Sequence, residues 1–408
     1  MYQRLSESCT APAAEPTAVA LGSVRIVPTP PAEPQRFDVG IAGAGQLARM
    51  TCLAAWPLGL RVGVVGAPNE PAGLVAAGVV AGDWKDPAAI RELGRVSKVV
   101  TLENEFVDAA VLAEVAAAGT PVYPLPERLA VIQDKALQKA LLDRHGLPVP
   151  PHVVVEQPAE LAAVGRDFGW PLVLKARKLG YDGYGNATSR TPEEAAEAFG
   201  RLDAGEGVLV EAFVPFVMEL AAMVARSTRG EEAVYPVCET VQRDHVCNEV
   251  IVPARIDEPL RTEAKRIARA AAAAAEGLGV TGVEMFLLED GQVLVNELAP
   301  RPHNSGHYSI EACETSQFEN HLRGILGLAL GPPLLRAPSA AMVNILGTVN
   351  GPSRPGLAGA VSVRGAHLHL YDKAEVRVRR KMGHVTALAG APDEALEIAR
   401  AAVQRVGL

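Results

Sequence analysis

The sequence predicts an α/β (α+β) protein in which three domains follow a flexible N-terminal tail. Its 408 residues are enough for two or three domains with sizeable cores. Residues 37–66 read as a strand, a helix and a second strand joined by a glycine turn. Residues 282–307 read as a β-hairpin with a carboxylate on each strand, followed by a polar segment between prolines.

The composition is that of an ordinary globular protein, with 49% hydrophobic and 21% charged residues. A formal net charge of −8 argues against a general nucleic-acid binder, which would carry a basic face. We find no apolar run long enough to span a bilayer and no secretory signal pattern. The five scattered cysteines read as reduced thiols. We therefore expect a cytoplasmic protein without nucleic-acid or membrane partners.

Residues 1–36 carry too little apolar surface to offset the entropy of ordering, so we predict a disordered tail. The first domain, 37–132, begins with strand 39–42, a helix that runs to residue 55 and strand 61–65. Gly43, Gly45 and Ala48 match a dinucleotide-binding turn, but no acid follows the second strand to hold a ribose. Tight strand-to-helix packing, or the edge of another ligand's pocket, is the alternative.

Further strands are predicted at 79–80 and 98–102. The second of these runs into Glu103 and Glu105, and the carboxyl ends of parallel strands are where open α/β sheets bind ligands. The alternative is that both acids favour the N-terminus of the helix that follows.

The second domain, 133–335, places basic residues where phosphates could bind. A single helix is predicted to run to Gly146 with Lys135 and Lys139 on one face, where solvated surface is the usual interpretation. Lys175 stands in an otherwise apolar strand and should reach an anion. The glycines of the next loop could close over phosphates, although a hairpin tip is the alternative; they are Gly180, Gly183 and Gly185.

An apolar slot with nearby acids follows at residues 211–219. Glu211 ends one strand and Glu219 lies inside the next, with Phe213 and Val214 between them. A nucleotide pocket needs a slot for the base, backbone groups to read its edge and an acid for the ribose hydroxyls. This stretch could supply all three.

The predicted hairpin carries Glu284 on its first strand, and Asn296 and Glu297 on its second. Carboxylates in apolar runs are costly unless paired or bound to a metal, and an all-oxygen cage suits Mg²⁺. The alternative is an edge hairpin with both acids in solvent. The polar segment 300–307 comes next and offers a cation, imidazoles and small hydrogen-bonding groups, which indicates an anion pocket.

The third domain, 336–408, is predicted to hold a strand near 342–347, a strand–turn–strand unit near 363–385 and a final helix at 392–406. Its basic patch would suit one phosphate, with a solvated surface as the alternative; the patch consists of Arg377, Arg379, Arg380 and Lys381.

Together these motifs resemble the ATP-grasp superfamily, and within it the 5-(carboxyamino)imidazole ribonucleotide synthases, from residue 37 to about residue 384. The motifs are GIAGAGQLARM, TLENE, QDKALQK, KLGYDGYG, EAFVPFVMEL, VEMFLLEDGQVLVNELAPRPHNSGH, SQFENHLR and YDKAEVRVRRKMGH. The resemblance implies an N-terminal Rossmann-like (pre-ATP-grasp) domain, an ATP-grasp domain and a small β-rich C-terminal domain. It also implies a homodimer.

The implied reaction is the ATP-dependent carboxylation of the amine of aminoimidazole ribonucleotide by bicarbonate, through carboxyphosphate, with Mg²⁺ or Mn²⁺. Arg301, His303, Asp182 and Lys373 would be catalytic. ATP would contact Lys135, Lys175, Gly180, Gly183, Gly185, Glu211, Phe213, Val214, Glu219 and Asn296, and the metal would contact Glu284 and Glu297. The ribonucleotide would contact Gly45, Gln46, Leu47, Glu103, Glu105, Tyr181, Tyr184, Asn304, Ser305, Lys373 and Arg380.

The sequence departs from the family pattern on the acceptor side. Tyr184 stands where a basic residue is usual, Glu239-Thr240-Val241-Gln242 replaces Glu-Asn-x-His, and Asp372 replaces a glycine. Two alternatives therefore remain, a related ligase that acts on another amine and an ATP-binding protein without turnover.

Overall fold

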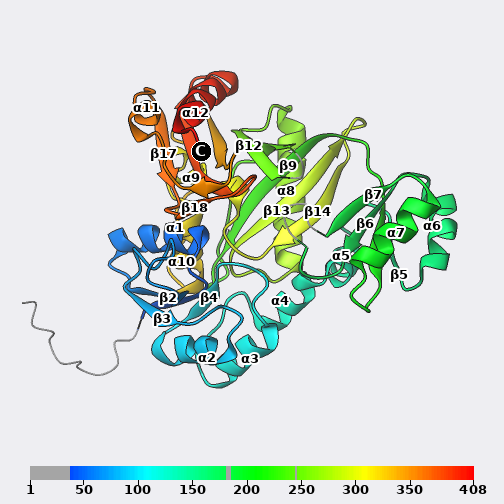
Figure 1. Cartoon of the computed structure of the whole chain (residues 1–408), viewed down its shortest axis with the longest axis horizontal. Helices are drawn as coiled ribbons and strands as arrows, with labels where there is room; N and C mark the ends of the chain where they lie inside the picture. The colour runs from blue at the N-terminus through cyan, green and yellow to red at the C-terminus, as the bar shows by residue number, and fades with distance from the viewer. Residues whose placement is uncertain (1–36, 181–184, 244–245) are drawn as a thin grey trace, which may run out of the picture. The chain divides into compact units, whose positions relative to one another are not determined.

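The computed structural model describes residues 37–180, 185–243 and 246–408. The predicted tail, 1–36, lies outside this range. The first four strands form a parallel sheet in the order β3-β2-β1-β4 (Figure 1). The elements of this region are β1 (Val39–Ala42), α1 (Gln46–Ala55), β2 (Val62–Gly66), β3 (Gly78–Ala81), α2 (Pro87–Val96), β4 (Val100–Leu102) and α3 (Ala109–Ala117). The predicted strand–helix–strand unit is confirmed.

The helix predicted to run to Gly146 is two helices, α4 (Pro126–Gln133) and α5 (Lys135–Arg144). Asp134 separates them in an extended conformation and caps α5, its carboxylate accepting from Ala136 N at 2.9 Å and Leu137 N at 3.3 Å. Because an aspartate side chain competes with the helical backbone for these N–H groups, it favours a helix start over a helix interior. The single-helix prediction is wrong at this residue, and Lys135 becomes the first residue of α5.

A second, antiparallel sheet has the order β5-β8-β6-β7, and α6 and α7 cover one of its faces. Its elements are β5 (His152–Val155), α6 (Leu161–Phe168), β6 (Leu172–Ala176), β7 (Asn186–Ser189), α7 (Pro192–Leu202) and β8 (Val208–Ala212). Leu172 and Leu174 point into the core under the helices. Strand alternation therefore sends Val173 and Lys175 to the opposite face.

The largest sheet of the described residues has the order β14-β13-β9-β11-β12-β15-β19-β17, with β10 on β9 (Figure 1). Its first strands are β9 (Phe216–Arg226), β10 (Glu232–Val234), β11 (Cys238–Arg243), β12 (Val246–Val252), β13 (Gly279–Leu288) and β14 (Val293–Ala299). The predicted hairpin is confirmed as the antiparallel pair β13–β14.

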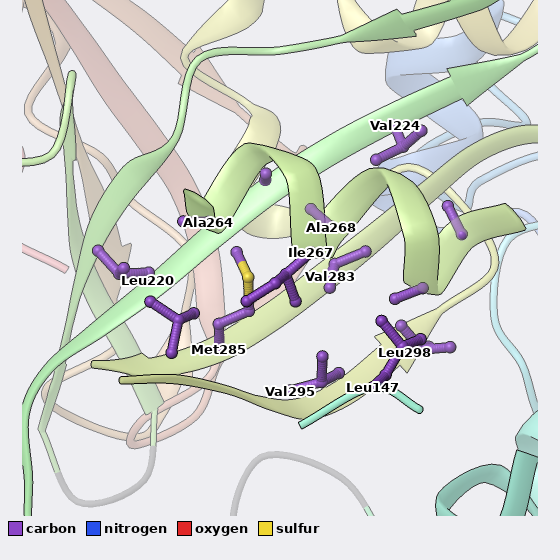
Figure 2. Packing of buried hydrophobic residues seen from close by; sticks show 14 of the residues in the cluster. Leu147, Leu220, Val224, Ala264, Ile267, Ala268, Val283, Met285, Val295 and Leu298 are labelled. Atoms are coloured by element: carbon purple, nitrogen blue, oxygen red, sulfur yellow. The ribbon is translucent and has the colours of Figure 1, made fainter. Parts of the chain in front are cut away.

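Helix α8 (Glu258–Ala274) packs on one face of this sheet. Its small residues Ala264 and Ala268 and the larger Ile267 lie against side chains of β9, β13 and β14 (Figure 2). Val283 and Met285 of β13 point into this core. Alternation places Glu284 and Phe286 on the other face, which α8 leaves open.

Helix α10 (Gln317–Ile325) connects the parallel sheet with the large sheet. Leu322 and Ile325 join the core under α1, and the same helix contacts β9 and β13. The short helix α9 (Ser309–Ala312) precedes it.

The C-terminal strands β15 (Ser339–Leu346), β17 (Ala366–Leu370) and β19 (Lys381–Ala389) continue the large sheet, since β15 pairs with β12. Helices α11 (Leu357–Val361) and α12 (Pro392–Val406) pack against them, and β16 (Gly351–Pro352) pairs with β18 (Glu375–Val376). Within the described part of the chain, no helix has the length and apolar character needed to cross a membrane.

Candidate active site

The β13–β14 hairpin places two carboxylates directly opposite each other. Glu284 and Glu297 are cross-strand partners, whereas the next pair is Met285 with Val295, so Asn296 is the extra residue of a β-bulge. Val295 and Leu298 both remain in the core. The bulge therefore frees two successive side chains, Asn296 and Glu297, from the core beside Glu284.

Three carboxylates share this face, and their charges are unequally balanced. Burial, together with the nearby Glu297 and Glu219, raises the pKa of Glu284 to about 7. Burial also opposes the charge on Glu297, but Lys135 outweighs it and lowers the Glu297 pKa. Lys135 and Glu297 form a direct ion pair. On this face the pKa values of Glu284 and Glu219 are raised, whereas that of Glu297 is lowered.

Helix α5 covers the free edge of β14. Gln138 pairs with this edge, its side-chain oxygen accepting from Leu298 N at 3.0 Å, and Lys139 Nζ donates to Val295 O at 3.2 Å. Pro148 O accepts from Val295 N at 2.7 Å. Because an unpaired edge would otherwise expose its backbone, these contacts fix α5, and with it Lys135, beside the carboxylates.

A buried ion triad joins the second sheet to α5. Glu211 on β8 contacts Lys175 on β6 at 2.7 Å and Lys139 at 3.0 Å. Burial alone would raise the Glu211 pKa, but the two ammonium groups lower it to about 2. Lys175 Nζ also donates to Asn296 Oδ1 at 3.1 Å. The triad holds Lys175 next to the bulge.

The predicted base pocket lies between β8 and β9. Val214 is buried and Phe213 is exposed, and Phe216 stacks on Phe286 with ring centroids 4.6 Å apart. Glu219 is the cross-strand partner of Phe286, and burial raises its pKa to about 7 despite a hydrogen bond from Gln242. Glu219 Oε2 has no hydrogen-bond partner in the described structure. A carboxyl oxygen without a hydrogen-bond partner, beside stacked rings, is suited to a flat ligand that carries hydroxyl groups.

The acids that follow β4 lie in two different environments. Glu105 pairs through both oxygens with Arg301, with Oε1 2.8 Å from Nη2. Glu103 accepts from the backbone N–H groups of Gly45 and Leu47 at 2.5 and 3.2 Å. Burial raises the Glu103 pKa, although these donors, Lys373 and Arg301 act in the opposite direction.

The glycine turn is thereby explained. A Cβ at Gly45 would lie 2.2 Å from Glu103 Oε1, and Gly43 has a φ of +123° with Glu103 Oε2 2.8 Å from its virtual Cβ. Both positions require glycine because the Glu103 carboxylate occupies the N-terminus of α1. A dinucleotide pyrophosphate would need that same place, so the dinucleotide alternative loses its support. Gln46, the residue after Gly45, is the first residue of α1.

The segment after Arg301 is held from several sides. His303 Nε2 lies 3.5 Å from Glu284 Oε1, and its Nδ1 accepts from Ser305 N at 3.4 Å. Asn304 and Asn344 exchange amide hydrogen bonds at 3.1 and 2.7 Å. Ser305 is buried. His303 is therefore held with its Nε2 next to Glu284.

The C-terminal basic residues approach from another side. Tyr371 packs with Leu47 of α1, and Lys373 Nζ donates to Lys381 O at 2.8 Å. Lys373 also lowers the pKa of Glu103, and Lys381 lowers that of Glu284. Arg380 Nη1 donates to Glu375 O at 2.9 Å, and burial lowers its pKa.

The structure brings a set of the predicted site residues together around the β13–β14 hairpin: Lys135, Lys175, Glu284, Asn296, Glu297 and His303. Gly180 and Gly185 flank a loop whose central residues, Tyr181, Asp182, Gly183 and Tyr184, lie outside the described residues. Sequence reasoning missed Gln138 and Phe286, and its interpretation of Lys139 as solvated surface is wrong, because Lys139 is buried. The apolar run around Lys175 signalled a buried ammonium there, but Lys139 sits in a charged helix that looks like surface.

Three family models match the chain. They are the ribonucleotide synthetase preATP-grasp domain at residues 37–133, the ATP-grasp domain at residues 140–318 and the phosphoribosylaminoimidazole carboxylase C-terminal domain at residues 340–398.

Relatives and solved structures agree with these matches. The chain is 41% identical over 355 residues to N5-carboxyaminoimidazole ribonucleotide synthase of Synechococcus elongatus, covering 85% of this chain and 88% of that protein. It is 43% identical over 364 residues to phosphoribosylaminoimidazole carboxylase of Schizosaccharomyces pombe, covering 87% of this chain but 66% of that protein. This chain thus spans just under two thirds of the yeast protein.

The fold is also similar to a crystal structure of N5-carboxyaminoimidazole synthase from Aspergillus clavatus in complex with ADP and 5-aminoimidazole ribonucleotide. The TM-score is 0.84 at 38% sequence identity, and the superposition covers 91% of this chain and 99% of that chain.

Proposed function

Because this chain belongs to the N5-carboxyaminoimidazole ribonucleotide synthase family of ATP-grasp enzymes, we propose that it carboxylates the amine of 5-aminoimidazole ribonucleotide with bicarbonate and ATP. The products are 5-(carboxyamino)imidazole ribonucleotide, ADP and phosphate, as a step of purine biosynthesis. The observation that carries the proposal is the Glu284–Glu297 pair, with Lys135 paired to Glu297, Lys175 bonded to the adjacent Asn296, and His303 next to Glu284.

ATP binds between the second sheet and the large sheet. Lys135 and Lys175 contact its phosphates, and their carboxylate partners, Glu297 and Glu211, orient both ammonium groups. The residue 211–214 segment reads the base edge, and Glu219 accepts from the ribose hydroxyls. Since Glu211 is itself held by two lysines, we assign it to positioning Lys175, and assign the base contact to the neighbouring backbone and Val214.

The donor set fits a magnesium or manganese ion. Glu284 and Glu297 offer carboxylate oxygens, and Asn296 offers its side-chain carbonyl oxygen. Hard divalent cations prefer such oxygen ligands. Burial and the neighbouring Glu297 and Glu219 raise the pKa of Glu284, so a cation held beside it would stabilise its charged form. A bound ion there would neutralise charge on the ATP phosphates.

Bicarbonate occupies the space beside Arg301 and His303. Its oxygen attacks the γ-phosphorus, the bond to ADP breaks, and carboxyphosphate forms. The amine then attacks the carboxyl carbon, phosphate leaves, and the amine loses one proton. Arg301 holds the anionic carboxyl group, while His303 can manage its proton. Because carboxyphosphate hydrolyses in water, the loop that includes Asp182 is expected to close over it.

The ribonucleotide binds beside the α1 N-terminus. Glu103 and Glu105 lie near its imidazole, with Gly45, Gln46 and Leu47 as the adjoining backbone. Lys373 and Arg380 contact its phosphate. The family resemblance also assigns Asn304 and Ser305 to this pocket, together with Tyr181 and Tyr184, which lie outside the described residues.

Two departures from the family pattern are locally compatible with this role. Asp372 has a φ of +59°, a conformation that aspartate tolerates better than most residues, so it can replace a glycine there. Gln242 stands where the family pattern has histidine, and it still donates a side-chain hydrogen bond to Glu219.

We also propose domains at 37–132, 133–335 and 336–408, a homodimer, and a cytoplasmic location. The family resemblance supports the domain boundaries and the homodimer. Among the described cysteines, Cys52, Cys238 and Cys313 are free and buried, which is typical of reducing compartments.

The decisive experiment measures ADP release with Mg-ATP while bicarbonate and aminoimidazole ribonucleotide are added separately and together. We expect strong stimulation only when both are present. Bicarbonate-dependent hydrolysis that ignores the ribonucleotide would favour a ligase for another amine, and ATP binding without any stimulated turnover would contradict an enzymatic role.

A further inference from the structure

We propose that Gln317 is a positioning residue that holds His303 in the bicarbonate pocket. The inference rests on the proposed function, which assigns His303 to that pocket. Gln317 is the first residue of α10 and is fully buried. Its Oε1 accepts from His303 N at 2.9 Å and its Nε2 donates to His303 O at 2.7 Å. One side-chain amide thus satisfies both backbone groups of His303, as a neighbouring strand would.

The same amide organises the turn that follows His303. Gln317 Nε2 lies 3.2 Å from His307 Nδ1, and a Cβ at Gly306 would be 2.4 Å from Gln317 Oε1. The backbone of Gln317 is fixed as well, because its N–H donates to Ser309 Oγ at 2.9 Å. Residues 303–307 therefore wrap around this one side chain.

The imidazole of His303 depends on this support. The ring lies over Gly282 of β13, where a Cβ would be 2.7 Å from His303 Cβ. From there its Nε2 faces Glu284 at 3.5 Å. His303 lies between β14 and the short turn at 304–306, and its carbonyl also accepts from Gly306 N at 3.0 Å. Without Gln317, the His303 N–H would lose the acceptor at 2.9 Å and the carbonyl would lose one of its two donors, so the ring could shift relative to the carboxylates.

Such a shift should affect catalysis more than ATP binding. Reacting groups must be placed closely, and a displacement of about 1 Å can cost roughly 100-fold in rate. The ATP contacts come from α5, β6 and the 211–219 segment. The Gln317 side chain instead bonds His303 and His307, on the bicarbonate side of the carboxylates. The expected signature is therefore a selective loss on that side.

Asn320 supplies a matched control on the same helix. It is also a fully buried amide, but it bonds Tyr235 Oη at 2.9 Å and both backbone groups of Gly331, away from His303. Gln317→Met and Asn320→Leu each remove one buried amide and keep a side chain of similar size. A purely structural role for Gln317 would make the two variants behave alike.

The experiment measures kcat and the KM values for ATP and bicarbonate, together with Tm, for the full-length wild type and each variant. We expect Gln317→Met to lower kcat on the order of 30-fold and raise the bicarbonate KM by about 10-fold, with the ATP KM nearly unchanged. Asn320→Leu should lower Tm while both KM values and kcat stay within about twofold of wild type.

Gln317→Glu is the second variant. It keeps the acceptor for His303 N–H and loses the donor to His303 O, so its bicarbonate KM should lie between those of the wild type and Gln317→Met. It replaces Gln317→Met if that variant does not fold. If the folded Gln317 variants keep the wild-type kcat and bicarbonate KM, the inference about Gln317 is wrong, while the proposed function is unaffected. A wild-type protein that ignores bicarbonate would overturn the proposed function, and the inference with it.

Discussion

Glu297 pairs with Lys135 and faces Glu284, so the proposed function gives it two roles, anchoring Lys135 and binding the metal. Glu297→Gln keeps the size of the side chain but removes its charge. We expect Mg²⁺-dependent ATP turnover to fall on the order of 100-fold, because Lys135 loses its anchor and the metal loses a charged ligand. Steady-state ADP release over a Mg²⁺ titration checks this.

Glu289→Gln is the matched control for this change. Glu289 is exposed at the turn of the same hairpin, so its substitution should leave turnover unchanged. Near-normal turnover in Glu297→Gln, with its Mg²⁺ dependence intact, would remove Glu297 from the metal site.

Individual charges were predictable where they interrupt an apolar strand, and not where they lie on a helix. Lys175, Glu284 and Glu297 stand among aliphatic residues, so the cost of burying an unpaired charge identified them. Lys139 is only 2% exposed, yet its neighbours along α5 are charged and polar. Only the approach of Glu211, from a distant part of the chain, makes that ammonium a buried one.

Asp134 determines where α5 begins and therefore where Lys135 lies. It caps the helix and pairs with Arg177, and it is almost fully buried. Asp134→Ala should cost about 0.5–2 kcal/mol for the cap, plus the loss of a partner for Arg177. Asp134→Asn keeps the cap and should be intermediate. Urea unfolding gives this order, and the ATP KM should rise in parallel as Lys135 moves.

Asp108→Ala provides the comparison for the cap alone. Asp108 caps α3 through Ala110 N at 2.8 Å and is exposed. Its loss should cost only the cap and leave the ATP KM unchanged. If Asp134→Ala cost no more than Asp108→Ala and did not alter the ATP KM, α5 would owe its position to other contacts.

Elements with a strong period were predicted, while their irregularities were not. Alternating residues gave both strands of the β13–β14 hairpin, and the Glu289–Gly291 turn gave their pairing. The bulge at Asn296 could not be predicted from the sequence. An extra residue interrupts the alternation of apolar and polar residues, but a strand end or a turn would interrupt it in the same way. It follows from packing, since Val295 and Leu298 both fill the core under α8.

At the scale of the whole molecule, the sequence shows where composition changes and cannot show which strands join. The predicted boundary at residue 336 falls just before β15, yet the large sheet passes across it through the β12–β15 pairing. A shared sheet depends on hydrogen bonds between distant backbone segments, which the side-chain pattern of either strand does not specify. The boundary itself stays a prediction.

Buried histidines should make the whole fold sensitive to acid. His321 accepts from Val280 N at 3.1 Å through Nδ1, and its Nε2 lies 3.0 Å from Thr101 Oγ1, so it links the large sheet to the parallel sheet. Burial lowers its pKa from 6.5 to about 4 and also lowers the pKa values of His307 and His384 well below normal. The unfolded chain therefore binds these protons more readily than the folded one.

The linkage fixes the direction of the effect. Stability is fully present above pH 6.5, the unfolded pKa, and falls as the pH drops toward the folded pKa values. Each histidine contributes a slope of up to about 1.4 kcal/mol per pH unit in that window. Glu219 and Glu284, whose pKa values are raised to about 7, act in the opposite direction in this window. The contribution of His321 is therefore measured as the difference in urea midpoint between the wild type and His321→Gln from about pH 7.5 to pH 5.5. The urea midpoint of His321→Gln should be lower than that of the wild type at the higher pH, because the substitution repacks the junction, but it should fall less on acidification.

His367→Gln, at an exposed position of β17, should follow the wild type throughout. If His321→Gln lost as much stability as the wild type over this range, His321 would not be the group that couples the junction between the two sheets to pH.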